Sequence, residues 1–72
     1  MSTEEEIIEK LLKENVEFRK MKELHVEYKE RLDEFSKKHY LSDSEILEKK
    51  NLKKKKLAAK DRLVAMIKEA SL

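Results

Sequence analysis

The sequence contains no cysteine, no glycine, no proline and no tryptophan. Without cysteine there is neither a disulfide nor a thiolate zinc cage, and His25 and His39 alone form no recognisable metal-binding spacing. Because glycine and proline punctuate chains into turns, few sharp reversals are expected. No apolar run approaches the roughly 20 residues needed to cross a bilayer, and the chain opens with glutamates instead of a basic signal-peptide head. We expect a cytoplasmic protein with no cofactor, no metal and no membrane contact.

Charged residues make up 47% of the 72 residues, and lysine, glutamate and leucine dominate. This composition is typical of long helices and coiled coils. A chain this short forms one domain, residues 1–72, and buries only about 60% of the surface that it exposes when unfolded. Its stability must therefore come from regular helix packing or from a partner chain.

A first helix is predicted over about residues 3–39. Ser2 and Thr3 are each followed by a glutamate three residues later, which is the capping-box arrangement that starts a helix. Apolar residues and histidines then recur at spacings of three and four, and Glu14 is the one clear interruption. The stripe consists of Ile7, Leu11, Phe18, Met21, His25, Tyr28, Leu32, Phe35 and His39, widened by Ile8, Leu12, Val16 and Leu24. Such a stripe keeps one side of a helix against a partner helix.

A turn is predicted at about 40–43 and a second helix at about 44–70. Short polar residues gather after Tyr40, and Ser42 with Glu45 forms another capping box. A connection this short makes the two helices antiparallel. The predicted fold is all-α, a long coiled-coil-like antiparallel two-helix hairpin, with self-association left open. The second stripe consists of Ile46, Leu52, Leu57, Ala59, Leu63, Met66, Ile67 and Ala70, supported by Ala58, Val64 and Ala65.

Folding the chain about Leu41 sets the register of this hairpin. It places Leu57 beside His25 and Leu63 beside Phe18, and it leaves the residues before about 11 projecting beyond the second helix. Residues 1–36 carry 7 Lys and Arg against 11 Asp and Glu, whereas residues 37–72 carry 11 against 5. The predicted register sets the basic stretch 49–60 opposite five acidic residues, Glu23, Glu27, Glu30, Asp33 and Glu34. Exposed pairs of this kind select the orientation more than they stabilise the fold.

Two segments resemble a known family. Phe18, Met21, His25, Tyr28 and Leu32 in the first helix, followed by Leu52-Lys53-Lys54-Lys55-Lys56-Leu57 and Lys60-Asp61 in the second, are similar to the pattern of the YdcH-like family of small bacterial proteins of unknown function. The resemblance covers roughly residues 18–67. Lys29 stands where the family usually carries an acidic residue. The resemblance implies a helical hairpin, with self-association open, and it implies no activity.

The preferred functional hypothesis is a non-enzymatic protein-interaction module that binds itself or another helical protein. Its predicted partner-binding residues face little or nothing within a single hairpin: Ile7, Ile8, Leu11 and Leu12. No phosphate-binding loop, zinc-protease motif or nucleophile beside a base occurs, and a two-helix rod offers almost no concave pocket for catalysis. His25 is predicted to be a polar seam residue that fixes the register, with a pH-dependent or ligand role as the alternative.

The alternative hypothesis is weak nucleic-acid binding through one ridge of the second helix. At about 100° per residue, four lysines line up there: Lys49, Lys53, Lys56 and Lys60. The net charge of only +2, the lack of an aromatic stacking platform and the predicted acidic residues opposite all weigh against it. The second helix alone is also basic and amphipathic, as membrane-surface and calmodulin-target segments are, but the hairpin occupies its apolar side.

Overall fold

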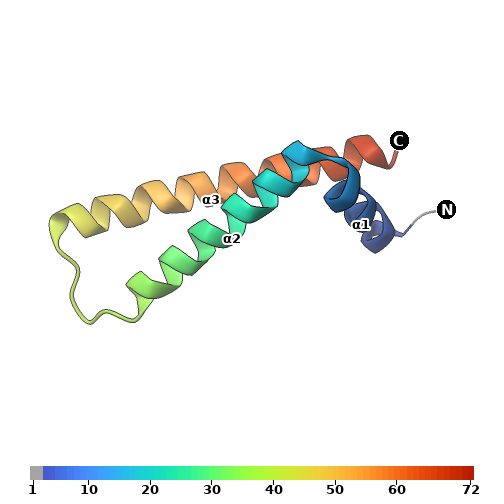
Figure 1. Ribbon diagram of the computed structural model, residues 1–72. Helices are drawn as coiled ribbons and strands as arrows, with labels where there is room; N and C mark the ends of the chain where they lie inside the picture. Colours follow the sequence, from blue (N-terminus) through green and yellow to red (C-terminus); the bar gives the residue numbers. More distant parts are fainter. Residues whose placement is uncertain (1–2) are drawn as a thin grey trace.

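The computed structural model describes residues 3–72 and contains three helices within them: α1 (Glu4–Glu14), α2 (Val16–Ser36) and α3 (Asp43–Ala70). Helices α2 and α3 lie antiparallel and make most of the interhelical contacts, while α1 crosses the end of this pair beside the C-terminus of α3 (Figure 1). The molecule measures 49 × 19 × 16 Å. None of its described helices combines the length and the apolar character needed to span a membrane.

The prediction of one continuous first helix over about 3–39 is wrong. The backbone is extended at Asn15, with φ −113° and ψ 109°, and this residue separates α1 from α2. The Asn15 N–H donates to the Leu11 carbonyl at 2.8 Å, which closes α1. Its side-chain Oδ1 accepts from the Phe18 N–H at 3.0 Å, which caps α2. One residue therefore satisfies both helix ends at the break.

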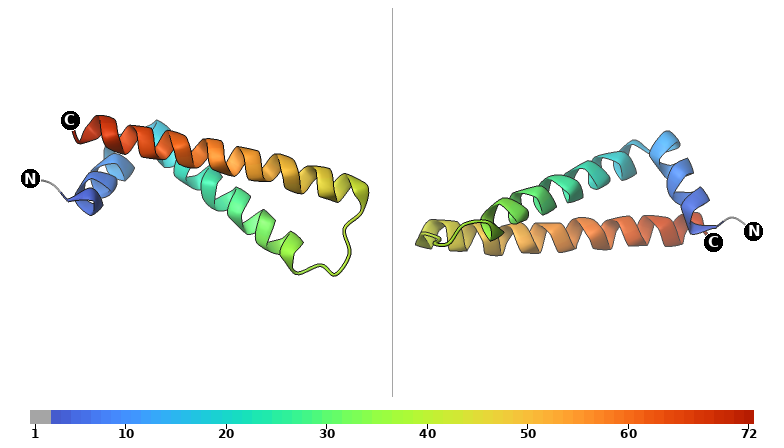
Figure 2. Two further views of the ribbon diagram at one scale, coloured as in Figure 1. Left: turned by 180° about the vertical axis from the view of Figure 1, so that it is seen from behind. Right: turned by 90° about the horizontal axis from the view of Figure 1, so that it is seen from below.

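The break lets α1 fold back so that its apolar side chains become half-buried. Figure 2 shows the backbone of α1 folded back beside the C-terminal end of α3. Ile8, Leu11 and Leu12 pack against a core cluster of Phe18, Leu63 and Met66. In a straight helix these residues would project past the end of α3, and Glu14 would occupy the apolar stripe. Fully burying one aliphatic side chain is worth about 1.5–3 kcal/mol, so half-burying three of them outweighs the interruption of one helical hydrogen-bond ladder that is recapped at once.

Two of the predicted helix starts have the expected caps. The Thr3 hydroxyl accepts from the Glu6 N–H, and a complete capping box joins Ser42 and Glu45 at the start of α3. Ser2, the other predicted cap, lies outside the described residues. At the loop end, α2 stops at Ser36, so His39, predicted to be part of the apolar stripe, is exposed and lies in the connection 37–42.

Most of the apolar stripe predicted for α2 faces α3 as expected, but Val16, which was predicted to widen it, is 61% exposed. Phe18 and Phe35 are buried, and the stripe residues between them are half-buried: Met21, His25, Tyr28 and Leu32. The stripe predicted for α3 is only partly correct. Ala59, Leu63 and Met66 are buried, but Ile46, Leu57 and Ala70 are exposed. At the loop end, the guanidinium carbon of Arg31 and Nζ of Lys38 lie 5.8 and 5.6 Å from the centre of the Phe35 ring.

Candidate functional site

One flank of the α2–α3 pair carries the ion pairs that join the two helices along their length. Arg62 Nη2 lies 2.6 Å from Glu17 Oε1, and Arg31 Nη2 lies 2.8 Å from Glu48 Oε1. Residues seven apart on a helix differ by only about 20° in direction. Lys55, which is seven residues from both Glu48 and Arg62, therefore belongs to the same flank. We call this side the paired flank.

The opposite flank is basic. Lysines from two helices contribute to it, and we call this set the basic face: Lys22 and Lys29 of α2, with Lys49, Lys53, Lys56 and Lys60 of α3. Helical geometry places each row on one side of its own helix. His25 lies between Lys22 and Lys29, three and four residues from them, on the side of α2 that faces α3.

The predicted charge matching between the helices is wrong. Within residues 3–72, no lysine of the basic face forms an ion pair, and both pairs of the paired flank use arginine instead. The acidic residues that the predicted register set opposite the lysines are all exposed: Glu23, Glu27, Glu30, Asp33 and Glu34. The predicted register matched positions along the helix axis and ignored rotation about it. At about 100° per residue, the four glutamates of this set point away from α3.

Two polar residues occupy the seam between α2 and α3 at the middle of the basic face. His25 is half-buried, and its Nε2 atom has no hydrogen-bond partner among the described residues. Lys56 is half-buried at the position predicted for Leu57, which is 59% exposed instead. Burial, followed by the charges of four lysines, lowers the pKa of His25, so its imidazole is neutral at pH 7. His25 lies in the seam as predicted, and whether it fixes the register stays a prediction.

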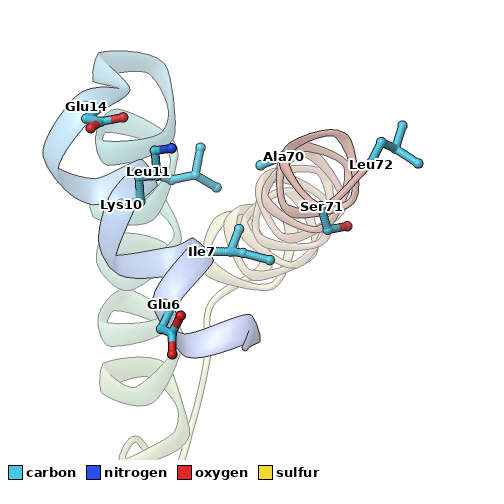
Figure 3. Close-up of a pocket in the computed structure, with 8 residues that line it drawn as sticks. All are labelled: Glu6, Ile7, Lys10, Leu11, Glu14, Ala70, Ser71 and Leu72. Atoms are coloured by element: carbon cyan, nitrogen blue, oxygen red, sulfur yellow. The ribbon is translucent and has the colours of Figure 1, made fainter. Parts of the chain in front are cut away.

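The predicted partner-binding residues no longer lack neighbours. Ile8, Leu11 and Leu12 pack on the core cluster, so the premise that they face nothing within one chain is wrong. Ile7 is half-buried and lines an open concavity of about 570 Å³ between α1 and the C-terminal end of α3. Figure 3 shows Ile7 and Leu11 extending from α1 toward the end of α3 that carries Ala70. Whether these residues bind a partner stays a prediction.

Sequence reasoning found four of the six lysines of the basic face and missed Lys22 and Lys29. Their spacing of seven, with His25 between them on nearly the same side, was the signal that identifies them. Ammonium groups donate hydrogen bonds and carry positive charge but ligate no metal. Among the described residues, no group of three or more histidines and carboxylates is arranged to hold a metal ion. The arrangement is suited to attracting and holding anions.

Comparisons of the chain with protein-family models, curated proteins and solved structures find no match. The resemblance to the YdcH-like family therefore stays a prediction.

Proposed function

We propose that this protein is a non-catalytic binding module that holds the phosphate backbone of nucleic acid on its basic face. One observation carries the proposal: six lysines from two helices share one flank, and none of them is neutralised by an ion pair within residues 3–72. Solvated lysine runs usually occur beside acids that compensate them. Here only one acid of α2, Asp33, lies on the side of Lys22 and Lys29, and a polyanion can supply the remaining charge.

The dimensions of the basic face fit this ligand. Lys49 and Lys60 are eleven residues apart, which is about 16 Å along the helix. A nucleic-acid strand rises about 3.4 Å per phosphate, so the row spans about five phosphates. The face contains lysines only, and it lacks the arginine, asparagine and glutamine side chains that read base edges. We therefore expect binding without sequence preference.

Fluorescence anisotropy with labelled single-stranded and duplex oligonucleotides tests the proposal. Affinity should fall between 50 and 200 mM salt, and four to six phosphate contacts give a slope of log K against log salt of about −3 to −5. The double variant Lys53→Gln/Lys60→Gln should lose most of the binding, whereas Lys54→Gln/Lys55→Gln, off the basic face, is the matched control. Equal loss in both, or no binding at low salt, contradicts the proposal. Tighter binding to anionic phospholipid vesicles or polyglutamate assigns the face to another polyanion.

A second candidate function is self-association, which is favoured by exposed apolar side chains on α3. Ile46, Leu57 and Val64 are all exposed, and their spacings of eleven and seven residues align them along one side of the helix. Sedimentation equilibrium at micromolar concentration tests this function. A dimer that dissociates in the Leu57→Glu variant supports it, and a strict monomer rules it out.

A further inference from the structure

Exposed apolar side chains stand among the lysines of the basic face. Val26 of α2 is 41% exposed and Leu57 of α3 is 59% exposed. Each follows one lysine of the face by four residues and precedes another by three: Lys22 and Lys29 around Val26, Lys53 and Lys60 around Leu57. Residues three and four apart are neighbours on a helix surface. The same alternation of cationic and apolar groups therefore occurs on both helices.

The two ion pairs of the paired flank show that these residues lie together on the opposite flank. Counting nine residues inward from both members of one ion pair reaches Val26 and Lys53, and counting from both members of the other reaches Lys22 and Leu57. Nine residues make about two and a half helical turns, so all four residues point away from the ion pairs. Each apolar side chain is also level with a lysine of the other helix.

We infer that the ligand of this face is single-stranded nucleic acid, whose bases lie against Val26 and Leu57 while its phosphates bind the lysines. The inference rests on the proposed function and names the form of nucleic acid. A single strand offers both kinds of group, because its unpaired bases are exposed beside its phosphates. A duplex stacks its bases inside and would cover these apolar side chains with phosphates and sugars.

The spacing of the apolar side chains fits a strand whose bases are drawn apart. By the register of the ion pairs, Val26 and Leu57 are four residues apart along the axis, which is about 6 Å. A stacked strand rises only about 3.4 Å per nucleotide. Val64, 41% exposed and seven residues beyond Leu57, extends the row. Aliphatic side chains make no hydrogen bonds to bases, so these contacts do not depend on base identity.

Other occupants fit this mixed surface less well. A second copy docked about a two-fold axis through Leu57 brings the lysines of both copies together, and like charges repel. A helix that lies in a membrane surface buries a continuous apolar side, whereas lysines interrupt this one at every turn. A single strand matches both the charge of the lysines and the gaps between the apolar side chains.

The test measures fluorescence anisotropy with three labelled ligands of equal length: an oligothymidylate of about ten nucleotides, an abasic oligomer with the same phosphates, and a duplex. Leu57→Ser is compared with Leu47→Ser, because Leu47 is 60% exposed and, nine residues from Lys56, faces away from α2. Leu57→Ser should weaken binding of the oligothymidylate about three- to tenfold and leave binding of the other two ligands unchanged. Val26→Ser should do the same from α2, and Leu47→Ser should have no effect.

The salt dependence separates this inference from the proposed function. The slope of log K against log salt should be the same in Leu57→Ser and the wild type, because the lysines remain. Salt-dependent binding that neither Leu57→Ser nor Val26→Ser weakens, or equal weakening for all three ligands, overturns the inference and leaves the proposed function standing. No binding of any oligonucleotide at low salt removes both. A dimer that Leu57→Ser dissociates, with oligothymidylate binding unchanged, assigns the apolar row to a second copy.

Discussion

Leu57 and Leu63 are both leucines of α3, yet the structure gives them opposite environments. Leu63 is 8% exposed and packs in the core cluster with Phe18 and Met66, whereas Leu57 is 59% exposed. Leu63→Ala should lower the free energy of unfolding by about 2–5 kcal/mol, because it removes buried methyl groups and leaves a cavity. Leu57→Ala should change it by less than about 0.5 kcal/mol. Urea unfolding followed by circular dichroism measures both, and similar losses would place the core elsewhere.

Residue identity alone could not assign the seam position at 56. A prediction from apolar character places Leu57 in the seam and leaves Lys56 in solvent. The packing of Leu52, Ala59 and Leu63 fixes how α3 is rotated about its axis, and this rotation turns position 56 toward α2. A lysine is tolerated there because its aliphatic stem packs while its ammonium group reaches water. The α2 stripe from Phe18 to Phe35 was predictable because its spacings of three and four are unbroken.

At the scale of elements, Asn15 decides that the N-terminal half forms two helices. Asn15→Ala should lower the free energy of unfolding by about 0.5–2 kcal/mol, because the Phe18 N–H loses its acceptor. Asn15→Asp should retain most of the stability, since aspartate caps helices equally well. Thermal and urea unfolding of both variants checks this. A stable alanine variant would show that the break does not depend on the cap.

This break was beyond prediction from the sequence. Asparagine is only a moderately poor helix former, and neither glycine nor proline marks the site. The gain from breaking the helix comes from tertiary burial of Ile8, Leu11 and Leu12 on α2 and α3. The local signs were weak: Glu14, an acidic residue at a stripe position of an otherwise apolar row, and Asn15, a residue type favoured at helix N-caps. The start of α3 was predictable because the interactions of its capping box are local.

The start of α3 should also respond to acid through Glu45. The hydrogen bond from Lys38, followed by those from the backbone and side chain of Ser42, lowers the pKa of Glu45 from 4.5 to about 2. The folded state therefore favours the carboxylate. Its contribution to stability is complete above about pH 4.5 and is lost as the pH falls toward 2. Urea unfolding between pH 2 and 5 should show a smaller loss in Glu45→Gln than in the wild type. Glu30→Gln, an exposed position, should leave the profile unchanged.

At the scale of the whole molecule, the sequence shows that the two halves carry opposite net charges, but it does not show which side of each helix carries the charged residues. Net charges of opposite sign favour the antiparallel pairing of α2 and α3, which the structure adopts (Figure 1). The attraction, however, acts through arginines of the paired flank and leaves the lysines of the basic face together. One-dimensional charge counts cannot separate the two flanks, because residues adjacent in sequence point about 100° apart.

The lysines of the basic face repel one another, and this repulsion lowers the stability of α3. Lys53 has Lys49, Lys50 and Lys56 three or four residues away, whereas Lys55 has no charged residue at those spacings. Like charges at such spacings destabilise a helix by about 0.2–0.5 kcal/mol each, and opposite charges stabilise it by similar amounts. Lys53→Glu should therefore raise the free energy of unfolding by about 1 kcal/mol at low salt, and Lys55→Glu should leave it nearly unchanged. If Lys53→Glu also removes oligonucleotide binding, the loss comes from the altered surface, because the variant is the more stable protein. A destabilised Lys53→Glu would mean that Lys53 interacts with an acid and that the basic face is compensated after all.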